Sequence, residues 1–242
     1  MQGLYLYGIV SFPPPLPRRI RGLEGDRVSL IPHAGLAAVV SRSRLTPRPP
    51  DAEHLTRHEA VVEEVMASRS VLPVRFNSLL RDEGAVRALL GERGPAFRAG
   101  LERVSGRMEM GLRVLWEPPG GAEAAVEQDE DAGGPGAAYL YRRLAEERRQ
   151  ARLRQAAERL IQALEAPFRS LAVESRLRRF MTERLLLSGA YLVERERVDA
   201  FRDGVARARL EFPGLSFLLT GPWPPYHFVE GAQGEPANPR DT

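Results

Sequence analysis

An acidic stretch rich in glycine and proline near the middle of the chain most constrains how this sequence can fold. Residues 117–131 contain six carboxylates and no basic residue, and a Pro-Pro-Gly-Gly run at 118–121 and a Gly-Gly-Pro-Gly run at 133–136 bracket most of it. Such a composition buries too little apolar surface to offset the entropy lost on ordering. We therefore predict a linker or hairpin tip at 117–136, with one domain before it at 1–116 and another after it at 137–229.

The first domain is predicted to be a mixed sheet with helices on it, in an order compatible with an elaborated ferredoxin-like α+β domain. Apolar runs with turn residues between them predict strands, and Asp51 is placed to cap a helix that runs to about Arg69. Alternation of apolar residues predicts a further strand that ends at Trp116. The expected strands are 4–10, a hairpin of 28–31 with 36–40, 71–76 and 106–116, and the expected helices are 51–69, 82–90 and 95–104.

The second domain is predicted to be a smaller α+β domain that opens with a long Arg-rich helix. The helix is expected from Ala137 to about Ala166, where Pro167 ends or kinks it. Strands at 170–178, 182–194 and 215–220 and a helix at 196–209 are expected to follow, and the tail at 230–242 is expected to be disordered. The predicted fold class is α+β with two domains.

Two residue types are missing, and their absence excludes several chemistries. The chain has no Cys, and all 35 of its basic residues are Arg. Thiol nucleophiles, thiolate metal sites, the phosphate-loop lysine and Schiff-base mechanisms are therefore excluded. The longest mostly apolar run, 185–193, is far shorter than the roughly 20 residues that a membrane span needs. With no signal-peptide pattern at the start, we expect a soluble cytoplasmic protein.

No motif for catalysis or cofactor binding stands out. His54 and His58 lie four residues apart on the first predicted helix, but the order of His and Glu is not that of a zincin and no third ligand is evident. A half-buried histidine with its hydrogen bonds satisfied explains His58 better than a metal ligand does. The sequence has no Gly-x-Ser-x-Gly elbow, and the glycines at 133–136 lack the preceding strand of a dinucleotide fingerprint. We expect no metal, no cofactor and no small-molecule substrate.

The Arg-rich helix allows two interpretations. Arg148, Arg149 and Arg152 could contact phosphates, which makes a basic-helix nucleic-acid-binding protein the alternative function. Glutamates at 146, 147 and 158 interleave with these arginines at helical spacing, however, and no aromatic residues are interleaved for base stacking. The formal net charge of +3 adds little support for nucleic acid. We expect a solvated or protein-facing helix that does not bind nucleic acid.

The most specific stretch lies near the C-terminus, at 221–229. Its three prolines restrict φ and favour extended geometry, so Trp223, Tyr226 and Phe228 are held at set angles at a small entropic cost. These rings either close the core after the last strand or form a rigid apolar docking edge. Both interpretations can hold for different rings.

Five blocks in order along the chain resemble the gas vesicle protein F/L family. They are residues 5–10, residues 58–63 with 71–76, residues 134–140, residues 190–193, and residues 221–226 with the sequence Gly-Pro-Trp-Pro-Pro-Tyr. Asn77 stands where a glycine is usual in that family. The resemblance spans residues 4 to about 229 and implies two α+β domains, the first of them ferredoxin-like, and no known catalytic activity.

The resemblance also implies what the protein binds. Family members are accessory or minor structural proteins of cytoplasmic gas vesicles, thought to bind the main shell protein and to assist nucleation and assembly together with other accessory proteins. We therefore expect contact with the shell protein at a sheet edge, at the Arg-rich helix and at the aromatic C-terminal segment. The candidate partner-binding residues are Arg75, Phe76, Arg148, Arg149, Arg152, Trp223 and Tyr226.

Overall fold

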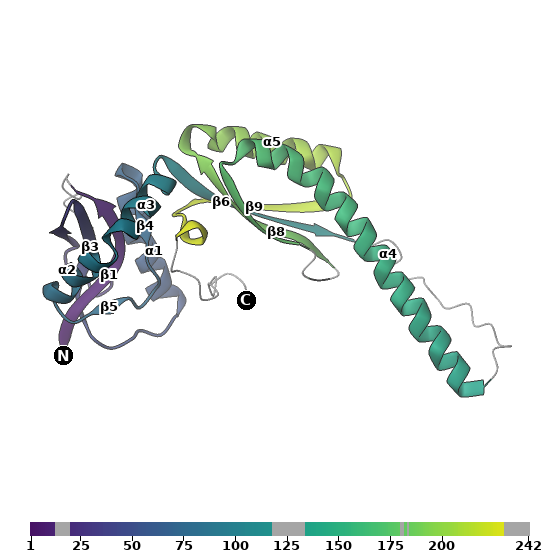
Figure 1. The fold of residues 1–242 in the computed structure, drawn as a ribbon, viewed down its shortest axis with the longest axis horizontal. Coiled ribbons are helices and arrows are strands. Elements are labelled where there is room, and N and C mark those ends of the chain that lie inside the picture. Colours follow the sequence, from purple (N-terminus) through teal and green to yellow (C-terminus); the bar gives the residue numbers. More distant parts are fainter. Residues whose placement is uncertain (13–19, 118–133, 180–181, 183, 230–242) are drawn as a thin grey trace. The chain divides into compact units, whose positions relative to one another are not determined.

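The computed structural model describes residues 1–12, 20–117, 134–179, 182 and 184–229 (Figure 1). These residues form two compact units, residues 1–109 with 222–229 and residues 110–221, each built around its own sheet. The predicted α+β class is confirmed, and both sheets are antiparallel. Most of the predicted linker and the whole of the predicted tail at 230–242 lie outside the described residues, and the predicted domain boundaries stay a prediction.

The sheet of the first unit is centred on its N-terminal strand. β1 (Gln2–Ser11) pairs with β3 (Leu36–Arg44) on one side and with the short strands β4 (Leu72–Pro73) and β5 (Leu79–Leu80) on the other, and β2 (Ser29–His33) pairs with β3. The order is β2-β3-β1-β4, with every pair antiparallel. Residues 5–10 of β1 are all buried, so this strand is covered on both of its faces.

Two local features set the geometry of this sheet. The predicted hairpin is confirmed, and its turn residues Ala34 and Gly35 both have positive φ (47° and 77°), as a tight hairpin turn requires. The register of β1 against β3 shifts between Leu6 and Gly8. A Cβ at Gly8 would lie 2.8 Å from the carbonyl oxygen of Leu72, so only glycine allows β4 to approach this closely.

Three helices pack on the first sheet: α1 (Ala52–Ser68), α2 (Glu83–Glu92) and α3 (Gly94–Val104). The expected N-cap of α1 is confirmed, because the Asp51 carboxylate accepts a hydrogen bond from the backbone N–H of His54 at 2.9 Å. Asp82 caps α2 in the same way through Ala85 N–H, at 2.8 Å. The buried face of α1 consists of His58, Val61, Val62, Val65 and Met66.

The second unit contains the element order β-α-β-β-α-β. Its elements are β6 (Arg107–Trp116), α4 (Gly134–Leu171), β7 (Glu174–Arg179), β8 (Leu185–Glu194), α5 (Val198–Glu211) after a 3-10 turn at Arg195–Arg197, and β9 (Leu215–Trp223). The strand order is β7-β8-β6-β9. β6, expected at the end of the first domain, is therefore a central strand of the second sheet, and the division between the units falls within β6 and within β9.

Of the two outcomes predicted for Pro167, an end or a kink of the helix, the end is wrong, because Pro167 lies inside α4. The helix continues to Leu171, so β7 begins at Glu174 and not at the expected Ser170. The turn after the proline is retained because Phe168 is fully buried and packs against the rings of Tyr191 and Phe201, with ring centroids 5.6–6.0 Å away. Core packing thus outweighs the single backbone hydrogen bond that a proline removes.

Candidate partner-binding surfaces

The loop after β4 places Arg75 and Phe76 beside a cluster of buried rings in the first unit. Arg75 is exposed and Phe76 is half-buried. The Phe76 ring meets the rings of Tyr5 and His58 edge-on, with centroids 6.2 and 5.9 Å apart. One side of the Phe76 ring therefore belongs to the core. The rest of the ring is exposed, and the exposed Arg75 precedes it in the sequence.

Asn77 holds this loop in place from a left-handed conformation. Its φ is +67°, a region that glycine and asparagine tolerate best, which explains why a glycine is usual at this position in the resembling family. Its N–H donates to the Tyr5 hydroxyl at 2.8 Å. Its side-chain amide exchanges two hydrogen bonds of 2.8 Å with the backbone of Arg48. The side chain thus provides contacts that a glycine would lack.

His58 and His54 lie in different environments. His58 is 3% exposed, stacks on Tyr7 and has its Nδ1 3.0 Å from the Tyr5 hydroxyl. Burial lowers the pKa of His58 to about 4, so the ring is neutral at physiological pH. The Nδ1 of His54 instead pairs with the capping carboxylate of Asp51 at 2.7 Å. Among the described residues, no group of three or more His, Asp or Glu side chains is arranged to hold a metal ion.

The aromatic C-terminal segment packs with the first unit and divides into core and surface. Phe228 is fully buried, which confirms the core interpretation for that ring. Trp223 and Tyr226 are each half-buried. His227 fixes the segment to β6, since its backbone N–H donates to the Glu109 carboxylate at 2.9 Å and its Nδ1 lies 2.6 Å from the other carboxylate oxygen.

The hydroxyl of Tyr226 lies in an acidic environment. It is buried and has no hydrogen-bond partner among the described residues. Burial raises the pKa of Tyr226, and the charges of Glu59, Glu63 and Glu109 raise it further. Tyr226 therefore stays protonated, with a buried hydroxyl that has no hydrogen-bond partner among the described residues.

In the second unit, the first half of α4 is the most exposed helical segment. Every residue from Tyr139 to Arg148 is exposed, and the helix extends past its own sheet here (Figure 1). Arg148 and Arg152 lie one turn apart on the same face, while Arg149 pairs with Glu146 at 3.6 Å. Large apolar side chains that sequence reasoning missed also lie here: Tyr139, Leu140, Tyr141 and Leu144 are 45–64% exposed.

The predicted site residues thus form separate surfaces. Phe76 packs against Tyr5 in the first unit, and Trp223 and Tyr226 lie in the C-terminal segment of the same unit. The three arginines lie on α4 in the second unit. The sequence signal for the missed apolar group was four large apolar residues within six positions just before the arginines.

Comparison with known proteins decides the family. The model of the family described as "Gas vesicle synthesis protein GvpL/GvpF" matches residues 3–230. The chain belongs to this family. The family consists of gas vesicle proteins and is not a known enzyme family. Among the helices of the described residues, none combines the length and apolar character that a membrane span requires.

Curated relatives match this GvpL/GvpF family member along almost its whole length. Gas vesicle protein L of Streptomyces sp. (strain CB03234) is 31% identical over 250 residues, which cover 93% of this chain and 92% of the relative. Gas vesicle protein F1 of Halobacterium salinarum is 27% identical over 233 residues, covering 95% and 93% of the two chains. Both halves of the chain therefore match gas vesicle proteins.

Solved structures of family members share the fold. The crystal structure of GvpF from Anabaena sp. PCC7120 superposes with a TM-score of 0.80 at 23% identity, covering 95% of this chain and 99% of that one. GvpF from Microcystis aeruginosa gives a TM-score of 0.74 at 22% identity, with 94% and 99% coverage. These likenesses concern the fold alone.

Proposed function

We propose that this GvpL/GvpF family member binds the main gas vesicle shell protein and assists nucleation and assembly of the vesicle, without catalysing a reaction. The observation that carries the proposal is the family match over residues 3–230. The protein would act in the cytoplasm on growing gas vesicles, as an assembly factor or minor structural component beside other accessory proteins.

The chemistry of the exposed surfaces supports a protein partner. A shell protein with an apolar gas-facing surface needs a partner that offers apolar area together with charges that fix orientation. The first half of α4 combines both, because Leu140, Tyr141 and Leu144 are exposed next to Arg148 and Arg152. Half-buried Phe76, Trp223 and Tyr226 offer apolar edges of the same kind in the first unit.

Nucleic-acid binding is less well supported by the same helix. Glu147 pairs with Arg143 at 3.4 Å and Glu146 pairs with Arg149 at 3.6 Å, so part of the positive charge is already neutralised. A phosphate-binding surface would present uninterrupted cations. We therefore prefer a protein partner.

The strand order favours a ferredoxin-like arrangement for the second unit instead of the first. β6, α4, β7, β8, α5 and β9 follow the β-α-β-β-α-β order, with sheet order β7-β8-β6-β9. The first unit has no helix between β1 and β2 within its described residues. We place the ferredoxin-like fold in residues 110–221.

Co-expression tests the proposed function directly. The main shell protein is produced with and without this chain, and both its soluble fraction and its co-purification with a tag on this chain are measured. We expect a larger soluble fraction and a stable complex that resists nuclease treatment. Unchanged solubility together with no co-purification would refute the proposal.

Two variants test the surfaces against a matched control. Reversal of Arg148, Arg149 and Arg152 to glutamate should weaken co-purification, and reversal of three arginines on and just before α5 (Arg195, Arg202 and Arg207), which alters net charge equally, should not. Trp223→Ala should weaken co-purification while the circular dichroism spectrum is unchanged. If Trp223→Ala unfolds the first unit, the role of that ring is packing.

A further inference from the structure

One side of α4 packs against its own unit in the second half of the helix and is exposed in the first half. Eighteen residues make five α-helical turns, so residues 18 apart lie on the same side of the helix. Tyr139, Arg143, Glu146 and Gln150 are exposed or nearly so, whereas their counterparts 18 positions later are almost completely buried. Those counterparts are Ala157, Ile161, Leu164 and Phe168, which pack toward α5 and the sheet.

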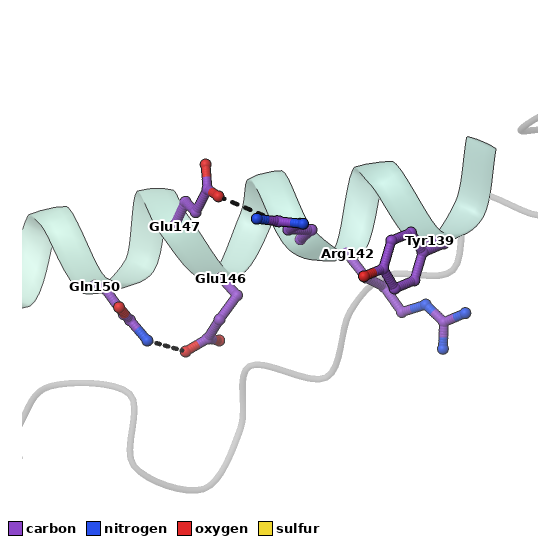
Figure 2. A pocket seen from close by; sticks show the side chains of 6 residues that line it. Tyr139, Arg142, Glu146, Glu147 and Gln150 are labelled. Carbon is purple, nitrogen blue, oxygen red and sulfur yellow. Dashed lines mark hydrogen bonds and ion pairs between the residues drawn. The ribbon is translucent and has the colours of Figure 1, made fainter. Parts of the chain in front are cut away.

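The exposed part of this side has a charge pattern that is complementary to itself. Residues 142–149 are Arg-Arg-Leu-Ala-Glu-Glu-Arg-Arg, so two cations and two anions flank the midpoint between Leu144 and Ala145 at equal distances. Six side chains of α4 line a shallow hollow on the helix, and Figure 2 shows them. Its lining residues fall into three pairs that are equidistant from the midpoint: Tyr139 with Gln150, Arg142 with Glu147, and Arg143 with Glu146.

We propose that this face binds a second copy of the chain, with the two α4 helices antiparallel and a two-fold axis passing the midpoint between Leu144 and Ala145. A two-fold interface requires that one patch be complementary to itself. In this register each Arg142 lies opposite Glu147 of the other copy, and each Arg143 lies opposite Glu146. The present partners of Glu146 and Glu147 are Arg143, Arg149 and Gln150 of the same helix, at 3.2–3.6 Å. These surface contacts exchange at little cost.

Other arrangements of the two helices have less favourable charge pairing. A parallel pair in register would place like charges opposite each other throughout. Shifting the antiparallel pair by one residue leaves either Glu146 opposite Leu144 or Arg143 opposite Ala145, so one of the two kinds of ion pair is lost. In the proposed register no two arginines of this face lie opposite each other.

The pairing should be weak and sensitive to salt. Exposed ion pairs contribute little each, and the remaining contact area comes from Tyr139 and the apolar stems of the arginines. We therefore expect dissociation constants in the micromolar range or above. Arg148 and Arg152 lie on the outer face of α4, which points away from the second copy. Self-association and the proposed shell-protein contact therefore use different faces of the helix.

A charge-swap experiment on the full-length protein tests the pairing. Sedimentation velocity is measured from low micromolar to several hundred micromolar protein, at about 0.1 M and about 1 M NaCl, where the screening length falls from about 10 Å to about 3 Å. The acidic variant carries Arg142→Glu with Arg143→Glu, and the basic variant carries Glu146→Arg with Glu147→Arg. The control carries Arg148→Glu with Arg152→Glu on the outer face.

We expect the wild type and the control to dimerise at low salt, and each charge variant to dimerise at least about tenfold more weakly, a difference of about 1.4 kcal/mol. An equimolar mixture of the two variants and the variant with all four reversals should both recover dimers. Far-UV circular dichroism confirms that α4 stays helical in each. A monomeric wild type at every concentration, dimers that both charge variants retain, or failure of the mixture to recover them would overturn the proposal.

Discussion

The neutral, buried His58 should make the first unit lose stability as the pH falls from 7.5 to 5. The ring is 3% exposed, and burial lowers its pKa to about 4 from an ordinary value of 6.5. Between these two values the unfolded chain binds a proton that the folded chain does not, so the free energy of unfolding decreases as the pH falls. The decrease begins below about pH 6.5 and is complete below about pH 4.

Its magnitude follows from the two pKa values. A difference of about 2.5 pH units, at about 1.36 kcal/mol each, gives about 3.4 kcal/mol for the complete loss at acid pH. At pH 5 the loss relative to pH 7.5 is about 2 kcal/mol, since only part of the transition has been crossed. That is a substantial share of the stability of an ordinary domain.

The assay uses urea unfolding followed by the emission of Trp223. Trp116 and Trp223 are the two tryptophans, and a Trp116→Phe background leaves Trp223 as the reporter of the first unit. His58→Gln keeps an acceptor for the Tyr5 hydroxyl but cannot titrate, so the carboxylates that titrate in this range affect both proteins equally. The difference between the pH dependences of the two free energies of unfolding therefore gives the contribution of the His58 ring.

We expect the protein with His58 to lose about 2 kcal/mol more than His58→Gln between pH 7.5 and 5. The proton signals of the His58 ring in NMR spectra should also stay at their neutral positions down to pH 5. Equal pH dependences in the two proteins, or a ring that titrates near pH 6.5, would refute the reasoning that burial keeps this ring neutral.

Substitutions at three further positions test the packing and the backbone conformation. Phe168→Ala removes a fully buried ring and should lower the free energy of unfolding of the second unit by about 3–5 kcal/mol in thermal or urea unfolding; a loss below about 1 kcal/mol would contradict its place in the core. Glu109→Ala removes the acceptor of the His227 N–H and should speed amide hydrogen exchange at 222–229 well before the rest of the first unit; unchanged protection there would show that the carboxylate does not fix the segment. Asn77→Ala and Asn77→Gly both lose the amide contacts, but alanine at a φ of +67° should cost about 1–2 kcal/mol more; equal stabilities would contradict the left-handed backbone.

Sequence reasoning succeeded where the signal was local. The cap at Asp51, the hairpin with its turn at Ala34 and Gly35, and the alternating strand that ends at Trp116 each depend on neighbours within a few residues. Such patterns report what the backbone does, because capping, turn geometry and alternation act over one turn or one pleat. The candidate arginines of α4 were also placed correctly on a helix for this reason.

Sequence reasoning failed where contacts between residues distant in the sequence determine the structure. Pro167 is a helix breaker by local rules, but Phe168 anchors the following turn in a core that Tyr191 and Phe201 complete. The contact between Glu109 and His227 spans 118 positions, and no motif at either residue indicates it. Of the candidate binding residues, exposure separates Arg75, Arg148 and Arg152 from the half-buried rings, and exposure depends on the whole unit.

The composition of the acidic stretch and the division of the chain into units depend on different physical properties. Composition predicts that 117–131 buries too little apolar surface to form part of a core, and residues 118–131 lie outside the described residues. The units, however, divide inside β6 and β9, two strands that pair in the second sheet. β6 and β9 neighbour each other in the second sheet, where Thr220 of β9 contacts Gly111 of β6. The same two chain segments are joined again where His227 contacts the carboxylate of Glu109, near the start of β6. The C-terminal segment therefore belongs to the first unit because it runs beside the start of β6. This position follows from strand pairing, which the composition of a segment does not indicate.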